Sequence, residues 1–194
     1  MYQKFFKGLL DFILSLIATI ILSPVMLIIA IAIKFDSKGP VFFLQERLGK
    51  NGKVFKIIKF RTMVVNAENI GDGLSIKSEN DDRITKVGKF LRKTSLDEIP
   101  QFINILKGEM SLIGPRPPAT YFPHKIEDYP EFQLKRFDVK PGITGLAQVR
   151  VRNQATWDEK IEIDLEYISN MTFINDLKIV FLTIKNILLH ENIY

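Results

Sequence analysis

Two carboxylates, Asp97 and Glu98, stand side by side at what reads as the start of a helix, with Arg92 before them. Arg116 follows in the stiff run Gly114–Pro117. A carboxylate with a reference pKa of about 4 is ionised at neutral pH, so it can attack phosphorus without a general base. Nearby arginines, a hard divalent cation and a helix dipole would offset its repulsion from an anionic substrate. The chemistry that these residue types allow is attack on a phosphate group.

Helix capping is the alternative explanation of the same pair. The segment from Ser95 to Glu98 matches a capping box, with serine at the N-cap and glutamate three residues later. Pro100 fits such a helix imperfectly, because its ring would meet the carbonyl of Leu96. Either the first turn is distorted or the regular helix begins at Pro100, and Gly108 is suited to end it. Spacing alone favours capping over chemistry.

The composition excludes several other site types. The chain has no cysteine, and its two histidines, His124 and His190, lie far apart, which argues against a zinc site or a Ser-His-acid triad. The excess of 27 Lys and Arg over 22 Asp and Glu gives a net charge of +5 and favours polyanionic partners. Neither a phosphate loop nor a dinucleotide fingerprint occurs. A phosphate site would therefore be assembled from scattered cations and a helix N-terminus.

The stretch Phe12–Ile33 carries no charged residue, and Lys7 and Lys34 flank it. About 20 residues of helix cross the hydrocarbon core of a bilayer, so this stretch should enter the membrane. Ser23 and Pro24 lie in its middle, where proline removes a helix hydrogen bond. If the helix breaks there, each half rises about 16 Å and could return to the same face, where the positive flanks favour the cytoplasm. A kinked spanning helix is the alternative.

Residues Val41–Phe60 predict a β-hairpin, because two apolar runs flank the turn signal Asn51-Gly52. Lys59 and Arg61 end the second run with two cations, a pattern typical of a solvated strand end when taken alone.

Later segments predict a loop, helices and a turn. Residues 66–80 are rich in Gly, Ser, Asn and Asp, as in a surface loop. Apolar residues recur at helical spacing after Asp82, in Glu159–Tyr167 and in Ile174–Leu189, while Pro141–Gly145 is typical of a turn. The last helix suits a membrane interface or a soluble core equally.

Motifs spread over nearly the whole chain carry a family resemblance. They are Ser23-Pro24, Gln45-x-Arg47-x-Gly49, Phe55-x-Ile57-x-Lys59-Phe-Arg-Thr-Met63, Asp82-x-x-Thr85-x-x-Gly88-x-x-Leu-Arg92, Ser95-Leu-Asp-Glu-x-Pro-Gln101, Asn104-x-Leu106-x-Gly108, Gly114-Pro-Arg-Pro117 and Pro141-Gly-Ile-Thr-Gly-x-Ala-Gln-Val149. Together they resemble the small monotopic phosphoglycosyl transferases, also called the bacterial sugar transferase family.

The resemblance implies transfer of a phosphosugar from a nucleotide sugar, usually a UDP-sugar, to polyprenol phosphate, as the first membrane step of glycoconjugate biosynthesis. It implies that Asp97 is the nucleophile, that it forms a covalent phosphosugar intermediate, and that Glu98 is its partner, both with Mg²⁺. The implied fold is a mixed, helix-rich α/β catalytic domain, residues 37–194, after a re-entrant membrane helix, residues 1–36, broken at Ser23 and Pro24.

The resemblance also implies further binding residues and a location. Phosphate-binding roles fall on Arg92, Arg116 and Arg152, and then on Lys59, Arg61 and Lys7. Many members read Asn-Gly-Arg-Asn where this chain has Arg-Val-Arg-Asn at 150–153, so Arg150 and Arg152 are alternatives. The implied location is the cytoplasmic face of the bacterial inner membrane, in contact with lipid. No nucleic-acid partner is expected, and the protein either forms a homodimer or acts as a monomer.

Two rival functions belong to other classes. A membrane-tethered polyanion-binding protein would need a contiguous basic face, whereas the cations here cluster beside Asp97 and Glu98, which would repel such a ligand. A metal-dependent membrane phosphohydrolase would share the carboxylates and cations but pass the phosphate to water. Release of nucleoside monophosphate without a lipid acceptor separates this rival from a transferase.

Overall fold

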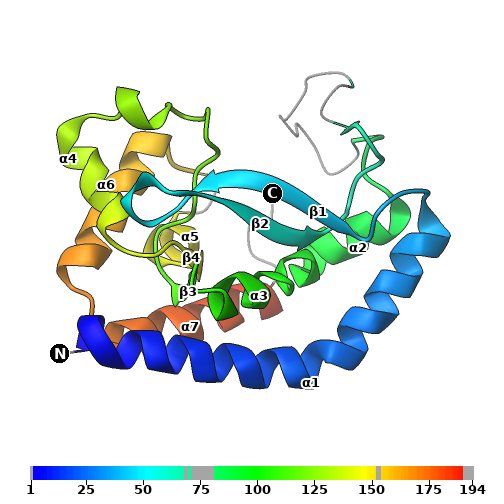
Figure 1. Ribbon diagram of the computed structural model, residues 1–194, viewed down its shortest axis with the longest axis horizontal. Helices are drawn as coiled ribbons and strands as arrows, with labels where there is room; N and C mark the ends of the chain where they lie inside the picture. The colour runs from blue at the N-terminus through cyan, green and yellow to red at the C-terminus, as the bar shows by residue number, and fades with distance from the viewer. Residues whose placement is uncertain (1, 68–69, 71–80, 152–153, 190–194) are drawn as a thin grey trace.

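The computed structural model describes residues 2–67, 70, 81–151 and 154–189. A long helix, α1 (Lys7–Asp36), runs along one side of the molecule, after a short π-helical turn at Tyr2–Phe6. The rest of the chain forms a mixed α/β domain, rich in helices, that lies on α1 (Figure 1). The expectation of a helix-rich α/β fold with a long apolar N-terminal helix is confirmed.

Two small sheets and a set of shorter helices make up this domain. In chain order they are β1 (Phe42–Leu48), β2 (Val54–Phe60), α2 (Lys86–Thr94), α3 (Gln101–Leu106), β3 (Ser111–Ile113), α4 (Glu131–Leu134), β4 (Gly142–Thr144), α5 (Leu146–Arg150), α6 (Trp157–Ser169) and α7 (Phe173–Leu188). Single 3-10 turns lie at Lys50–Gly52, Leu96–Glu98, Ile126–Asp128 and Lys135–Asp138. The expected loop at 66–80 falls mostly outside the described residues.

The predicted hairpin is confirmed. Strands β1 and β2 pair antiparallel from Phe42 opposite Phe60 to Leu48 opposite Val54. Asn51 and Gly52 both have positive φ, 56° and 69°, as a tight turn at this site requires. The Asn-Gly signal therefore located the turn correctly.

The second sheet corrects the turn predicted at Pro141–Gly145. Strands β3 and β4 pair parallel there, with Ser111 opposite Gly142. A Cβ on Gly142 would lie 2.1 Å from the Gly114 nitrogen, so glycine is needed for the close approach of two backbones. The glycines that suggested a turn serve packing between strands.

The capping box predicted at Ser95–Glu98 is also wrong. Ser95 has φ 56° and ends α2 in the left-handed region, and its side chain makes no capping bond. Leu96–Glu98 form a 3-10 turn, and α3 begins at Gln101 directly after Pro100, close to the second alternative that the sequence offered. Gly108, at φ 79°, follows the end of α3 as expected. Asp97 and Glu98 thus lie on a short turn between two helices.

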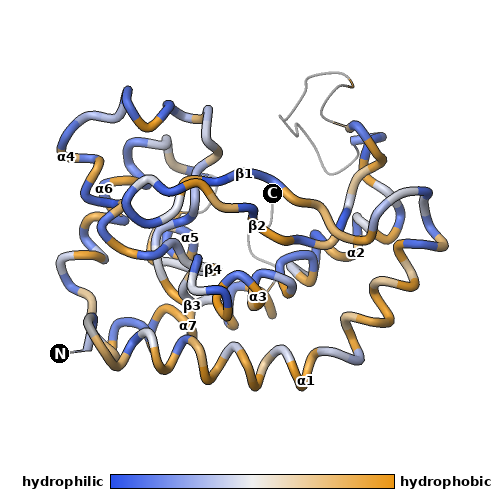
Figure 2. Tube along the Cα trace, viewed as in Figure 1, coloured by the Kyte–Doolittle hydropathy of each residue, from blue (hydrophilic) through white to orange (hydrophobic). Residues whose placement is uncertain are grey.

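Helix α1 continues through Pro24 for its full 30 residues, so proline bends the helix without ending it (Figure 1). Ser23 Oγ donates to the Ile20 carbonyl at 2.8 Å, next to the bend. Most of the helix is apolar and faces outward (Figure 2). Within the described part of the chain, α1 is the helix long and apolar enough to cross a membrane.

Helix α7 divides into two faces. It buries Asp176, Ile179 and Asn186 against the domain. Its outer face exposes large apolar side chains, among them Phe173, Ile174, Leu177, Phe181 and Leu188. An outward apolar face favours the interfacial alternative for this helix over the soluble core.

Candidate active site

The two adjacent carboxylates lie within reach of two predicted cations. Lys59 Nζ donates to Glu98 Oε1 at 2.5 Å and lies 4.0 Å from Asp97 Oδ2. Arg116 Nη1 lies 3.6 Å from the same oxygen of Glu98. The structure therefore brings Asp97, Glu98, Lys59 and Arg116 together from segments far apart in the sequence.

The strand register explains the position of Lys59. Side chains alternate along β2, so Lys59 shares a face with Phe55 and Ile57, which are buried in one core cluster with Ile105 of α3. The same face therefore turns the lysine towards the connection that leads into α3. Its neighbour Phe60 is buried in a different cluster.

The two carboxylates differ in how their charge is held. Burial raises the pKa of Glu98, but Lys59 and Arg116 together outweigh it and bring the pKa to about 2. For Asp97 burial is the largest effect and raises the pKa, against the opposing charge of Lys59. Asp97 is 14% exposed and, within the described residues, accepts no hydrogen bond. It is the carboxylate with unmet bonding capacity.

Arg92 approaches the site from α2. Its Nε donates to Thr62 Oγ1 at 2.9 Å, and its charge partly opposes the rise that burial causes in the pKa of Asp97. Helix α2 can lie this close because Gly88 faces Thr62: an added Cβ would be 2.0 Å from the Thr62 carbonyl oxygen. The glycine thus lets the helix bring a third predicted cation to the edge of the site.

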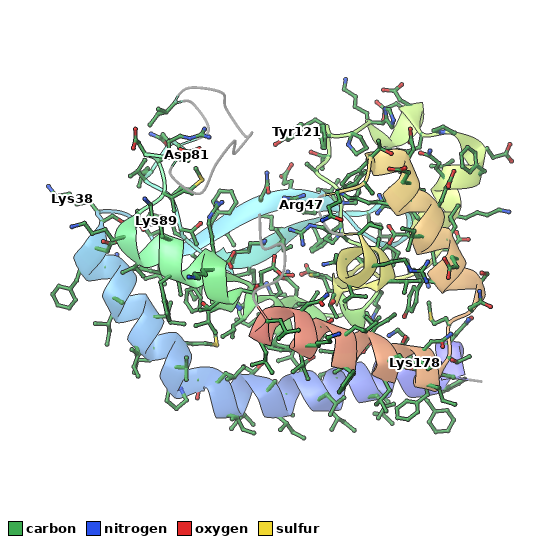
Figure 3. All side chains as sticks on the ribbon, turned by 180° about the vertical axis from the view of Figure 1, so that it is seen from behind. Lys38, Arg47, Asp81, Lys89, Tyr121 and Lys178 are labelled. Carbon is green, nitrogen blue, oxygen red and sulfur yellow. The ribbon has the colours of Figure 1, made fainter. Side chains whose placement is uncertain are left out.

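Sequence reasoning missed two further cations. Burial, followed by the charge of Arg116, lowers the pKa of Arg47 to about 10, and the same two causes lower the pKa of Lys160. Arg47 lies on β1 beside the loop that carries Tyr121 (Figure 3). The sequence motif Gln45-x-Arg47-x-Gly49 contributed to the family resemblance, but no function was predicted for Arg47. Lys160 lies on α6, and no local pattern marked it.

Two of the predicted phosphate-binding residues have other partners. Lys7 Nζ donates to Asp176 Oδ2 at 2.7 Å and lies 3.9 Å from Asp11. The guanidinium of Arg61 donates to main-chain carbonyls of residues 37–38, just after α1. Within the described part of the chain, neither cation contacts the two carboxylates.

Of the two alternative arginines near the end of α5, only Arg150 lies within the described residues. Arg150 holds Glu166 with both terminal nitrogens, at 2.5 and 3.0 Å, on the exposed surface. Arg152 lies outside the described residues. The choice between the two arginines therefore stays a prediction.

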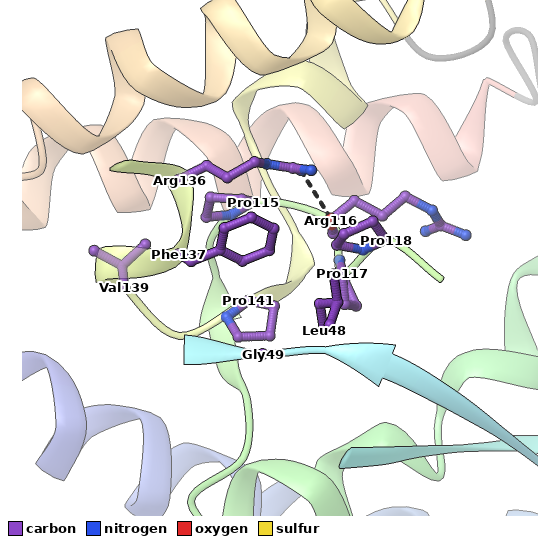
Figure 4. A pocket seen from close by; sticks show the side chains of 10 residues that line it. All are labelled: Leu48, Gly49, Pro115, Arg116, Pro117, Pro118, Arg136, Phe137, Val139 and Pro141. Atoms are coloured by element: carbon purple, nitrogen blue, oxygen red, sulfur yellow. Dashed lines mark hydrogen bonds between the residues drawn. The ribbon is translucent and has the colours of Figure 1, made fainter. Parts of the chain in front are cut away.

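The loop that carries Arg116 borders a small, open pocket (Figure 4). Its walls come from β1, from the loop and from the segment after α4. They are Leu48, Gly49, Pro115, Arg116, Pro117, Pro118, Arg136, Phe137, Val139 and Pro141. The pocket is mostly apolar, with two guanidinium groups at its wall.

A magnesium ion at this site would need oxygens of a substrate in addition to Asp97 and Glu98. Mg²⁺ is commonly held by one or two carboxylates together with substrate phosphates. Asp97 has oxygens that accept no hydrogen bond, and Glu98 is kept ionised. In the described ranges, no group of three or more His, Cys, Asp and Glu could hold a metal ion.

The arrangement as a whole suits phosphate chemistry at a membrane. Asp97, a carboxylate that accepts no hydrogen bond among the described residues, stands beside several cations, which can offset the charge of a diphosphate. The domain that holds them lies on a long apolar helix. These features suit an enzyme site that handles a phosphate-bearing substrate next to a membrane.

Comparison with known proteins gives the family. The sequence profile of the bacterial sugar transferase family matches residues 2–190, and the chain belongs to this family. The galactosyl transferase CpsE of Streptococcus agalactiae is 44% identical over 193 residues, covering 94% of this chain and 42% of that protein. The UDP-glucose:undecaprenyl-phosphate glucose-1-phosphate transferase of Klebsiella pneumoniae is 45% identical over 194 residues, covering 97% and 41%.

The shares covered differ among relatives. This chain spans about two fifths of the two transferases above. The uncharacterized sugar transferase EpsL of Bacillus subtilis is 40% identical over 188 residues, covering 96% of this chain and 89% of that protein. The match is therefore to one region of the longer relatives and to nearly the whole of a short one.

Proposed function

We propose that the protein transfers a sugar 1-phosphate from a UDP-sugar to undecaprenyl or another polyprenol phosphate and so initiates polysaccharide synthesis. The observation that carries this proposal is Asp97, a largely buried carboxylate that accepts no hydrogen bond among the described residues and lies beside Lys59. The family and the names of its relatives supply the substrate classes.

The proposed reaction has two displacements at one phosphorus. An oxygen of Asp97 attacks the phosphorus that bears the sugar, and the bond from this phosphorus to the bridging oxygen breaks, so that UMP leaves. A phosphate oxygen of the polyprenol phosphate then attacks the same phosphorus. The bond to Asp97 breaks, the carboxylate is regenerated, and the product is a polyprenyl diphosphate sugar.

The surrounding residues have separate roles in this reaction. Lys59 bridges the two carboxylates and offsets the repulsion between Asp97 and the donor. Glu98, kept ionised, holds Lys59 and Arg116 in place. Arg92 and Arg116 face charge that grows on the leaving phosphate. Magnesium, held by Asp97 and Glu98, supplies Lewis-acid stabilisation when it is bound.

We further propose that α1 is re-entrant and that both of its ends lie at the cytoplasmic face. Near its start, Asp11 accepts from Ser111 Oγ at 2.6 Å, and at its end Asp36 accepts from the Val87 nitrogen at 2.9 Å. Both partners belong to the same domain, residues 37–194. A helix that crossed the bilayer would separate its ends by the full hydrocarbon thickness, about 30 Å. The outward apolar face of α7 would add an interfacial contact.

A turnover assay tests the function. Purified protein is incubated with a panel of UDP-sugars, with and without polyprenol phosphate, while released UMP is measured. We expect sustained release only with the acceptor, and at most one UMP per enzyme without it. Sustained release without acceptor would show a phosphohydrolase. Salt-sensitive nucleic-acid binding with no UMP release would show a polyanion-binding protein.

Removal of magnesium tests the metal. Chelation should slow turnover by about 10² to 10³-fold, because the ion supplies several kcal/mol of charge stabilisation. Added Mg²⁺ should restore the rate, with calcium as the control ion. Full turnover in excess chelator would contradict the proposed role of the ion.

Cysteine labelling tests the topology, since the chain has no cysteine of its own. Gln3→Cys and Lys38→Cys place one thiol at each end of α1, where both native side chains are exposed. A membrane-impermeant maleimide should label both variants in inverted vesicles and neither in intact cells. Labelling of the first variant from outside the cell would show a spanning helix.

A further inference from the structure

The loop Pro115–Pro118 has an unusual way of being held in place. Three of its four residues are proline, so only Arg116 has a backbone N–H. All four carbonyls nevertheless accept a hydrogen bond from another element. The bonds are Gly142 N to Pro115 O (2.9 Å), Arg136 Nη2 to Arg116 O (3.0 Å), Arg47 Nη1 to Pro117 O (3.2 Å) and Leu48 N to Pro118 O (3.0 Å). The loop is therefore anchored through its acceptors.

Arg136 is a deeply buried side-chain donor to this loop. It lies in the 3-10 turn Lys135–Asp138 and is 3% exposed. The same nitrogen that donates to Arg116 O also donates to Asp164 Oδ2 on α6, at 2.8 Å. Its guanidinium carbon lies 5.4 Å from the ring centroid of Trp157. Figure 4 shows the group directed at the Arg116 backbone.

We infer that Arg136 is a positioning residue that sets the place of Arg116 in the active site. The inference rests on the proposed function, in which Arg116 acts on the donor phosphates. A charge-assisted bond to a carbonyl is stronger than a neutral one, and apart from Arg116 the loop has no backbone N–H that could anchor it instead. Without it the Arg116 guanidinium, 3.6 Å from Glu98, is no longer fixed.

Substitution of Arg136 tests the positioning of Arg116 without removing a charge that acts directly on the site. Arg47 also donates to the loop, but its own charge acts on Arg116 and on Glu98, so its substitution would mix two effects. Arg136 has Asp164 as its ion-pair partner and is shielded from solvent. The variant Arg136→Lys keeps the charge beside Asp164. The ammonium of lysine is carried on a shorter side chain, so it does not reach the position of Nη2, the nitrogen that donates to both acceptors.

A double-mutant cycle tests the inference. We expect Arg136→Lys to lower kcat/KM by about 10 to 100-fold, the size of a small misplacement of a catalytic group. In an Arg116→Ala background the same substitution should have almost no further effect, because the side chain that it positions is gone. Equal losses in both backgrounds would overturn the inference.

A second readout and a control separate this result from instability and from failure of the proposed function. UDP affinity, measured by calorimetry on the same four proteins, should show the same non-additivity even where turnover is too slow to measure. Ile161→Ala, in the neighbouring core cluster, should lower Tm while kcat/KM stays unchanged. An equal loss of kcat/KM in this control would overturn the inference. Wild-type protein that binds UDP but never releases UMP would overturn the proposed function alone.

Discussion

Two places in this protein hold a lysine between two carboxylates, with almost the same geometry. The distances are 2.7 and 3.9 Å from Lys7 Nζ to Asp176 and Asp11, and 2.5 and 4.0 Å from Lys59 Nζ to Glu98 and Asp97. Residue type and spacing do not distinguish the two places. The difference lies in what surrounds the charges.

Around Lys7 every carboxylate oxygen has a donor. The bonds are Tyr167 OH to Asp176 Oδ1 (2.7 Å), Tyr2 OH and Lys7 Nζ to Asp176 Oδ2 (2.5 and 2.7 Å), Ser111 Oγ to Asp11 Oδ2 (2.6 Å) and Leu112 N to Asp11 Oδ1 (3.3 Å). Such a satisfied buried network fixes α1 to β3 and α7, and it has no capacity left for a ligand.

Around Lys59 the two carboxylates are not satisfied in the same way. Glu98 has two cations as partners, Asp97 accepts no hydrogen bond within the described residues, and further arginines face the pair. This place therefore has an excess of positive charge together with carboxylate oxygens that can still accept hydrogen bonds. This surplus, more than the presence of a Lys-carboxylate cluster, distinguishes the candidate site, where the proposed reaction places its anionic substrate.

Substitution of the two aspartates, Asp97 and Asp11, is the most direct test of this difference between the two places. Asp97→Asn should lower turnover on the order of 10⁴-fold or more, because the amide cannot form the phosphosugar intermediate. Transfer of radiolabel from the donor to the protein should disappear with it. Asp11→Asn is the matched control and should still acquire label. A labelled Asp97→Asn protein would disprove the covalent mechanism.

The two lysines should separate catalysis from stability. Lys59→Met should slow turnover by about 10² to 10³-fold, as expected for loss of one preorganised charge. Lys7→Met should instead lower the free energy of unfolding by about 3 kcal/mol, because it leaves buried carboxylates without their cation. Turnover and denaturation of both variants in detergent check this. If Lys7→Met slowed turnover without loss of stability, its network would be part of the site.

The smallest effect should come from a single hydroxyl. Tyr2→Phe removes one of the three donors to Asp176 and should cost about 1 kcal/mol of stability with turnover unchanged. Thermal unfolding beside the turnover assay is sufficient. An unchanged melting temperature would mean that the network at the start of α1 contributes less than its short bonds suggest.

Sequence patterns located the elements whose rules are local. The Asn51-Gly52 turn, the long apolar helix and the amphipathic α7 follow from neighbouring residues, and the structure has all three. The capping box shows the limit of such rules. Ser95–Glu98 has the pattern but Glu98 is taken by Lys59, whereas Thr156 and Glu159 form a complete box that had not been predicted.

The candidate site was predicted only in part, because patterns of neighbouring residues do not show contacts between distant segments. Asp97 and Arg116 lie in short, distinctive motifs, whereas the role of Lys59 was implied only by the family resemblance. Lys7 has an equally distinctive position, but its partner Asp176 lies 169 residues away, so the sequence could not show that this cation is already paired. Arg136 shows no pattern at all, since its role depends on a carbonyl that only the folded loop presents.

The packing of α1 has a consequence for how substrates meet. Ile29 and Ile33 in the second half of α1 share a core cluster with Ile99, two residues after Asp97. This packing holds Asp97 close to α1, the helix that is long and apolar enough to enter a membrane. In the proposed reaction a lipid acceptor would need only lateral diffusion to reach Asp97. The encounter between enzyme and acceptor then becomes a search in two dimensions.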